Sequence, residues 1–445
     1  MIETFLIAIG TFVPMLIILV VVHEFGHFFT ARAFGVKDLE FGIGYPPKAF
    51  GFYTGKTTVT IDQETRFVNL TGPEDLHQGR IIRVSSAEDS SGNLVARVIE
   101  SPQRGSKPKG PPSRQELGQE AYLNHEGKVR EVSGNSLILA DMVYSLNWTP
   151  LGGFVRLAGE SNPAVPKSLA SKGVGPRAIV LVAGSFMNAL LPLVLFTMLF
   201  ILPHDVPVGD TGDVTVIGVA AASAAAAAGI QPGDIIIQAN GLSMTRTSDL
   251  AEVVQRSEGS PIELLVARGE GQEALTVTPL FDEAGNRWLA GVSMQLTNVP
   301  VERRSEAPWT AVGLAFSNTW GMLVLLKQEI LGWITGAGAP ELSGPIGIAQ
   351  ITGEVTQQMG IQGWLLLAIL FSINLAILNI LPIPMLDGGR LLFVAIEWVR
   401  RGKRVSPERE GLVHLIGFIV LITLIVLISA NDISRLIQGG SPLGG

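Results

Sequence analysis

Two histidines and a glutamate stand together early in the chain, in the segment His23-Glu24-Phe25-Gly26-His27. On a helix, residues four apart share one face, so both imidazoles can reach a single metal ion. Two neutral imidazoles, a third protein ligand and an open position for water suit Zn²⁺. Glu24 could take a proton from that water and pass it to a leaving amine. The alternative is a chance pattern on an interfacial helix, because three fixed positions in five residues are only moderately specific.

The third ligand is expected far away in sequence, in the segment 379–390, which reads NILPIPMLDGGR. Pro382 and Pro384 cannot continue a regular helix, and the two glycines after Asp387 permit an unusual backbone turn. Such a break at membrane depth is tolerated only against protein or a wet cavity. A carboxylate placed there fits a zinc ligand better than a lipid-facing group, although Asp387 could instead cap a helix at the interface.

Four apolar stretches are long enough to cross a bilayer, which takes about 20 helical residues. They are Thr4–Val22, Ala178–Leu202, Gly363–Leu386 and Gly411–Ala430. The alternative is a set of buried helices in a soluble core, but four such stretches argue against it. Glu3 is the only charge before the first stretch, and no small-residue cleavage site follows. That stretch is therefore expected to be an uncleaved span rather than a signal peptide.

The composition agrees with a membrane protein. The 445 residues are 47% hydrophobic and only 16% charged, whereas a soluble domain usually carries about 25% charged residues. The balance of 32 Lys+Arg against 39 Asp+Glu gives a net charge of −7, which argues against a nucleic-acid binder. The chain has no cysteine, so disulfides and thiolate metal sites are excluded.

Basic residues predict the orientation of the spans. Lys and Arg are frequent in 23–177 and in 388–410, whereas none precedes the first span and none follows the second until Arg246. Cytoplasmic loops carry the excess of Lys and Arg, so both termini and the region 203–362 should lie outside. The first and third spans then both run from outside to inside. Their far ends lie at one depth, which places His23, His27, Glu24 and Asp387 together.

At these residues the chain resembles the site-2 protease family of intramembrane zinc metalloproteases, in its bacterial branch similar to the regulator-of-sigma-E protease. The resemblance covers most of the chain outside about 55–142. It implies regulated proteolysis of single-pass transmembrane substrates, such as anti-sigma factors or signal-peptide remnants, by zinc-activated water. The matching segments are His23–His27, Phe41–Pro47, Pro150–Glu160, Ala183–Asn188, Leu342–Ala349 and Asn379–Arg390.

Carried over position by position, the resemblance implies that His23, His27 and Asp387 are zinc ligands and that Glu24 is the catalytic base. Asn379 would bind the substrate or the oxyanion near the scissile peptide, and Asn188 lies in the family's core-facing motif. Ser185 stands where the family usually has proline, away from the metal motif. The implied partners are transmembrane substrates and the lipid bilayer, and no nucleic acid. The implied location is the bacterial inner membrane, with the active site towards the cytoplasmic side.

Residues 212–281 alternate short strands with two short helices and resemble one PDZ domain of the bacterial protease type. Such a module can bind a peptide terminus by strand addition, or it can act only as a steric filter. The regulator-of-sigma-E type carries two such modules, whereas this chain has room for one. Pro308–Trp333 mixes apolar and polar residues, which suggests an amphipathic helix on the outer face rather than a fifth span.

The insert 55–142 is the largest departure from the family. Its segments Thr57–Ile61, Gly79–Val84, Leu94–Ile99 and Gly127–Val132 alternate like strands, and Ser101–Gly118 reads as a loop. We expect a small β-rich cytoplasmic unit beside the mouth of the active site. The remaining histidines are expected to be ordinary polar residues rather than ligands; they are His77, His125, His204 and His414.

Together these features predict a polytopic α-helical membrane protein with four transmembrane helices, a PDZ-like α/β domain and a β-rich cytoplasmic insert. The expected parts are a first transmembrane helix with the HExxH motif (1–54), the β-rich insert (55–142), a membrane-associated β-hairpin (143–177), a second transmembrane helix (178–203), the PDZ-like domain (212–281), an amphipathic helix with a linker (300–362), a third transmembrane helix with the Asp motif (363–390) and a fourth (411–430).

Two other classes of protein remain as alternatives. A membrane scaffold could bind partners through its PDZ-like module and hold a structural or inactive zinc site. Glu24 and the open fourth position that three protein ligands leave argue against it. A transporter with broken helices at a metal site is the weaker alternative, because the sequence shows no internal repeat.

Overall fold

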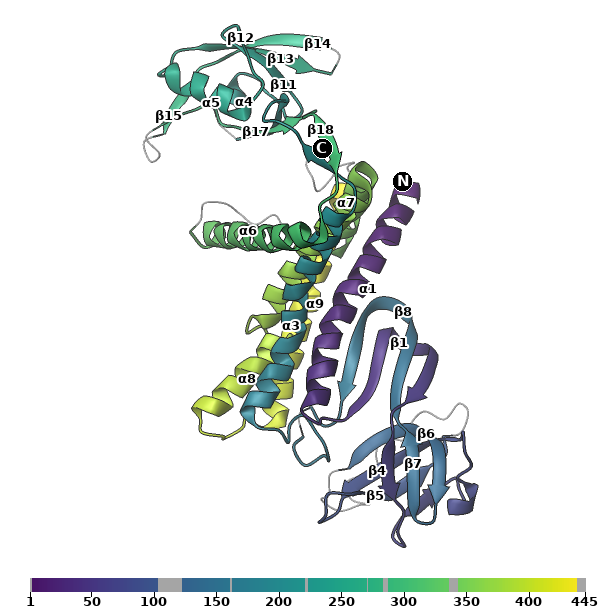
Figure 1. Cartoon of the computed structure of the whole chain (residues 1–445). Helices are drawn as coiled ribbons and strands as arrows, with labels where there is room; N and C mark the ends of the chain where they lie inside the picture. Colours follow the sequence, from purple (N-terminus) through teal and green to yellow (C-terminus); the bar gives the residue numbers. More distant parts are fainter. Residues whose placement is uncertain are drawn as a thin grey trace. The chain divides into compact units, whose positions relative to one another are not determined.

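The computed structural model describes residues 2–102, 122–160, 162–220, 223–269, 271–282, 287–335 and 343–437. The chain forms two compact units (Figure 1). The first consists of Met1–Leu199 with Pro308–Gly445, and the second is Phe200–Ala307.

Long helices dominate the first unit. The predicted spans coincide largely with four of them, although the helices extend beyond the apolar stretches. The first predicted span, for example, is part of a helix that continues for eleven residues past Val22, so the HExxH motif lies on the same helix as the span. The helices of this unit are α1 (Ile2–Ala33), α3 (Val174–Ile201), α6 (Pro308–Thr335), α7 (Pro345–Ile380), α8 (Asp387–Val399) and α9 (Pro407–Ile437).

Five described helices are long and apolar enough to cross a membrane, whereas four spans were predicted. The additional one is α6, at Pro308–Gly332, where a surface helix was expected. Its mean hydropathy is 1.3, the lowest of the five, and the other four reach 2.1 to 2.9. Figure 1 shows α6 running across the direction of α1 and α3. Length and composition thus allow five spans, and α6 is the least apolar of them.

The predicted break after the third span is present. Helix α7 ends at Ile380, directly before the segment that contains Pro382 and Pro384, and α8 begins at Asp387. The prolines remove backbone donors and clash with the preceding turn, so the helix cannot pass through them. At its other end α7 begins earlier than the predicted span and bends at Gly360, whose φ of 61° is non-helical.

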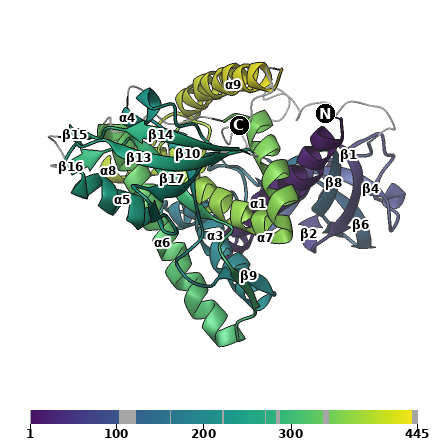
Figure 2. The same cartoon turned by 90° about the horizontal axis from the view of Figure 1, so that it is seen from above.

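The strands β1 (Asp38–Thr54) and β8 (Met142–Leu157) form a folded hairpin that lies beside α1 (Figures 1 and 2). Each strand bends, so that four paired segments lie side by side in the order 153–157, 38–43, 143–146 and 48–54. The segment 153–157 pairs with a strand segment, 38–43, on one side only. Its other edge is available to groups from α1.

The insert between these two strands is a mixed, mostly antiparallel sheet. Its strand order is β2-β7-β6-β4-β5-β3, and β2 also pairs with β5. Strands lie at all four predicted segments. Val59, Ile82 and Leu137 are fully buried in its core. Most of the predicted loop at Ser101–Gly118 lies outside the described residues. The strands are β2 (Thr57–Thr60), β3 (Arg66–Val68), β4 (Ile81–Glu88), β5 (Leu94–Glu100), β6 (Leu123–Ser133) and β7 (Ser136–Ala140).

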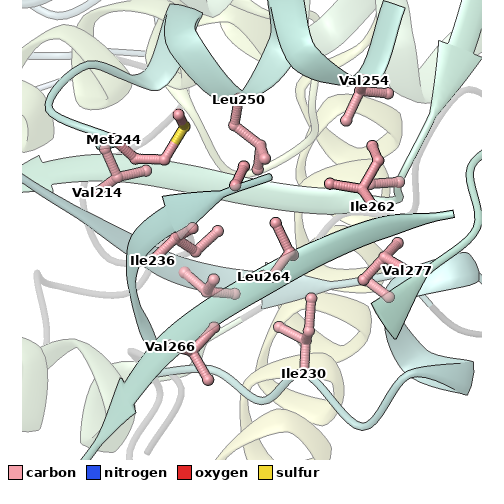
Figure 3. Packing of buried hydrophobic residues seen from close by; sticks show 14 of the residues in the cluster. Val214, Ile230, Ile236, Met244, Leu250, Val254, Ile262, Leu264, Val266 and Val277 are labelled. Atoms are coloured by element: carbon pink, nitrogen blue, oxygen red, sulfur yellow. The ribbon is translucent and has the colours of Figure 1, made fainter. Parts of the chain in front are cut away.

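The second unit is built on one sheet in the order β14-β13-β11-β10-β17, with β12 paired to β11. Figure 3 shows Ile236 and Leu264 of this sheet packed among the buried side chains, with Leu250 of α5 nearby. Its elements are β10 (Asp213–Val219), α4 (Ala224–Ala227), β11 (Ile235–Ala239), β12 (Leu242–Ser243), α5 (Thr247–Arg256), β13 (Ile262–Arg268), β14 (Gly271–Val277) and β17 (Val292–Thr297).

The sheet extends beyond the predicted module 212–281. Strand β17 pairs along the whole of β10 and so completes the sheet from outside that range. It is separated from β14 by the short hairpin β15 (Leu280–Asp282) and β16 (Arg287–Leu289). The chain enters and leaves the unit through β9 (His204–Pro207) and β18 (Val301–Arg304), which pair with each other.

Candidate metal centre

Two imidazoles and a carboxylate converge where α1 meets the start of α8. The Nε2 atoms of His23 and His27 lie 3.1 Å apart, and Asp387 Oδ2 lies 3.0 Å from the first and 3.1 Å from the second. Tetrahedral ligands at 2.0–2.1 Å from zinc are about 3.3 Å apart, so this triangle is close to the spacing of three zinc ligands. The three residues named from the sequence are thus brought together, and their donor set fits zinc.

Helix α3 orients the ring of His27. Nδ1 of this histidine donates to the backbone carbonyl of Val180 at 2.8 Å. A proton held on Nδ1 leaves the lone pair of Nε2 available, and that atom faces His23 and Asp387. The hydrogen bond therefore prepares His27 as a neutral metal ligand.

Asn188 of α3 lies behind the other imidazole. Its Nδ2 is 3.5 Å from His23 Nδ1, and its buried Oδ1 has no hydrogen-bond partner among the described residues. Rotating the amide by 180° places Oδ1 where it can accept a hydrogen bond from the N–H at His23 Nδ1, which gives both groups a partner. The backbone carbonyl of Asn188 accepts a hydrogen bond from Ser372 of α7 at 2.7 Å. Asn188 thus links three helices at the site.

Two glycines allow α1 and α3 to approach closely enough to build the site. A Cβ on Gly184 would lie 2.5 Å from His27 Nε2 and 2.6 Å from His23 Nε2. A Cβ on Gly26 would overlap the backbone of Ala183. The missing side chain at Gly184 leaves the space that the imidazoles occupy, and the one at Gly26 lets the backbone of α3 approach α1.

The carboxylate of Glu24 contacts the hairpin. Its Oε2 accepts the backbone N–H of Val155 at 2.9 Å, from the open edge of the segment 153–157. Gly153 on the same edge is also close, since a Cβ there would lie 3.9 Å from Glu24 Cγ. The predicted base therefore has a defined position between the converging residues and a strand edge.

A tight turn presents Asp387 to the histidines. The residue is the first of α8, and two backbone hydrogen bonds fold the turn: Ile383 N–H donates to Leu381 O, and Leu386 N–H donates to Ile383 O. A Cβ on Gly388 would overlap the backbone of this turn, so only glycine fits there. The unusual backbone predicted at the two glycines is therefore not found there, because both are helical residues of α8; the positive φ of this turn belongs to Met385.

Asn379 lies in the last turn of α7 and is half-buried. Its side chain is not one of those that converge with His23, His27 and Asp387 in the described part of the chain. Its predicted role in binding substrate therefore stays a prediction.

A network of buried charged and polar side chains joins the hairpin to the insert. It lies outside the helices that could span a membrane. Asp141 accepts hydrogen bonds from Lys37 Nζ at 2.7 Å and from Thr57 Oγ1 at 2.8 Å, and its second oxygen lies 2.7 Å from His125 Nδ1. Burial opposes ionisation of Asp141, but the hydrogen bond with His125 and the charge of Lys37 hold its pKa below the usual value. His125 is a structural residue of this network.

Sequence reasoning did not identify Gly184 or the contact between Glu24 and Val155. Gly184 belongs to a matching segment, but nothing in the residue type tells that its missing side chain makes room for two imidazoles. The Val155 donor is a backbone group and leaves no trace in the sequence. Both depend on which surfaces of α1, α3 and β8 meet.

The chain matches peptidase family M50 over residues 11–64 and 129–424, and a domain of unknown function, DUF5666, over residues 51–100. It is 33% identical to the zinc metalloprotease RasP of Geobacillus kaustophilus, over 98% of this chain and 99% of that protein. It is 30% identical to the regulator of sigma-W protease RasP of Bacillus subtilis, over 97% of this chain and 98% of that protein. Among solved structures, the PDZ domain of an SdrC-like protein from Listeria monocytogenes aligns with 20% of this chain and 93% of its own, with 20% identity and a TM-score of 0.18.

Proposed function

The chain belongs to peptidase family M50 and is an intramembrane zinc metalloprotease, and we propose that its zinc ligands are His23, His27 and Asp387. The observation that carries this assignment is the convergence of their three ligand atoms within 3.1 Å of one another. They come from the helix that continues the predicted first span and from the break after the third. Glu24 is the proposed catalytic base.

Each group has a distinct task in peptide hydrolysis. Zinc, when bound, lowers the pKa of water and polarises the scissile carbonyl. The carboxylate of Glu24 accepts the proton of the attacking water and returns it to the nitrogen of the leaving amine. Its hydrogen bond from Val155 occupies one carboxylate oxygen and leaves the other for this transfer. Asn379 is proposed to hold the unwound peptide with its amide.

The proposed substrates are single-pass membrane proteins cut within or near their spans. A relative carries the name regulator of sigma-W protease, which agrees with membrane-bound regulators of transcription, such as anti-sigma factors, as one substrate class. The proposed location is the inner membrane of a bacterium. The second unit, whose sheet carries two short helices, is proposed as a PDZ-like domain that binds peptide termini or filters substrates by size.

A substrate helix must open before its peptide bond can be attacked, because its carbonyl groups are tied into the i−4 ladder. The unwound backbone cannot remain unpaired away from water. The edge of 153–157 that faces Glu24 has no strand partner among the described residues, and Val155 already donates its N–H to Glu24 there. The remaining backbone groups of this edge support its proposed role as the docking strand for substrate. Substrate opening should therefore contribute to the barrier to cleavage.

Replacing two residues near the substrate's cut site by Gly-Gly should raise the rate of cleavage several-fold, because glycine lowers the cost of unwinding by about 1 kcal/mol per residue. The measurement is single-turnover cleavage of a model single-pass substrate by the purified protein in detergent. The control carries the same pair three helical turns away, where the rate should stay unchanged. Equal rates for all three substrates would show that opening does not limit cleavage.

The proposed orientation places the insert inside the cell and the second unit outside, from the distribution of Lys and Arg. Ser248→Cys, on the exposed surface of α5, should react with an impermeant thiol reagent in intact cells. Ser91→Cys, at an exposed turn of the insert, should react only after the membrane is permeabilised. The chain has no cysteine of its own, so each label reports one position. The reverse pattern would overturn the orientation.

A further inference from the structure

The turn that presents Asp387 contains a backbone conformation that most residues avoid. Met385, two residues before Asp387, has a φ of 83°, in the region that favours glycine. Such a conformation persists only where the surroundings hold it in place. The groups that contact Met385 therefore help to decide where the carboxylate of Asp387 lies.

Helix α9 supplies the group that holds this turn. The backbone N–H of Met385 donates to Nδ1 of His414 at 2.8 Å. The ring of His414 also packs against Phe393 of α8, with centroids 5.7 Å apart. One turn further along α9, a Cβ on Gly417 would overlap Pro384, so the helix backbone lies directly on the turn. His414 and Gly417 together form a seat for residues 384 and 385.

The same helix is fixed to α7 at its other end. Oδ2 of the buried Asp432 accepts the backbone N–H of Gly347 at 2.9 Å, in the first turn of α7. None of the residues in the most apolar window of α9 is fully buried in the structure. Two polar contacts therefore hold α9 in place: Asp432 holds it against the start of α7, and His414 holds it against the turn before α8.

The hydrogen bond defines the tautomer of His414. Its Nδ1 accepts a hydrogen bond from the backbone N–H of Met385, so the ring carries its own proton on Nε2. Nε2 lies 4.0 Å from Oε1 of Glu410, one turn earlier on α9. With Nδ1 engaged by the backbone, the ring acts on the turn and does not reach the converging ligand atoms.

We propose that His414 is a positioning residue of the metal centre. By accepting the N–H of Met385, it holds the left-handed turn that sets Asp387 against His23 and His27. The inference rests on the proposed role of Asp387 as a zinc ligand. It assigns α9, which contributes no ligand, a part in zinc affinity.

The test is the zinc affinity of purified full-length variants, measured by competition with a chromophoric chelator. His414→Ala should weaken zinc binding about tenfold or more, as loss of a residue that orients a metal ligand does. His414→Asn should bind zinc within about threefold of the native chain, because Asn Oδ1 occupies the position of Nδ1 and accepts the same N–H. His414→Leu keeps the volume without an acceptor and should resemble the alanine variant. Leu415→Ala, at the exposed neighbouring position, is the matched control.

A second substitution separates positioning from general packing. Adding Met385→Gly to His414→Ala should recover at least about threefold in zinc affinity, because glycine adopts positive φ without support. Native affinity in His414→Ala, or equal loss in the Asn and Leu variants, would overturn the proposal. The zinc affinity of Asp387→Asn is measured in parallel. If this variant keeps zinc, the assignment of Asp387 as a ligand fails. If Asp387→Asn loses zinc while His414→Ala binds it with native affinity, only the proposed role of His414 is rejected.

Discussion

Glu24→Gln should bind zinc as tightly as the native chain and cleave substrate about 10² to 10⁴ times more slowly. Glutamine has the shape of glutamate, and its amide oxygen can still accept the N–H of Val155, so the local structure is retained. An amide cannot take the proton of the attacking water, so the chemical step loses its base. The measurements are zinc content and single-turnover cleavage of the same purified sample.

The control for this variant is Glu88→Gln, which makes the same change at an exposed position in β4 of the insert. It should match the native chain in both measurements. If Glu24→Gln loses zinc but has the same unfolding temperature as the native chain, Glu24 is a ligand. Native turnover would show that another group is the base.

Gly184→Ala should weaken zinc binding strongly although it changes no ligand. The added methyl group would lie 2.5 Å from His27 Nε2 and 2.6 Å from His23 Nε2, in the space where the ligand atoms converge. Because α1 packs against α3 through Gly26, the imidazoles cannot withdraw without separating the two helices. We expect zinc affinity to fall at least about 100-fold, the upper end for losing an orienting group and comparable to Asp387→Asn.

Gly175→Ala is the matched control, because it changes a glycine of the same helix at which a Cβ meets nothing within 4 Å. It should retain about one zinc per chain in metal analysis. Alanine also favours helix over glycine, so this variant should be no less stable than the native chain. Full zinc occupancy in Gly184→Ala would mean that the metal site lies elsewhere than at the three converging atoms.

The sequence by itself determined which residues could form the metal centre. The spacing of His23 and His27 on a helix, and the break that Pro382 forces before Asp387, follow from local geometry that holds in any fold. The same is true of the apolar stretches, whose length reflects the thickness of a bilayer, and of the alternating strands in the insert. The predicted directions of the first and third spans then joined these separate signals into one site, and the resemblance to site-2 proteases implied the same ligands.

Other features depended on tertiary packing. Strand β17 joins β10 from outside the predicted module, because strand order is set by pairing between distant segments rather than by local pattern.

The geometry of the site was likewise decided by contacts between elements distant in sequence. Gly184 matters because α3 crosses α1 at the histidines, and Val155 matters because a backbone donor of β8 reaches Glu24. His414 was expected to be an ordinary polar residue, and only the seating of α9 on the turn at Met385 gives it a role. Residue types and spacing therefore determined the chemistry of this protein, whereas the tertiary structure decided how each group is held, because packing and backbone hydrogen bonds between separate elements leave no local signal.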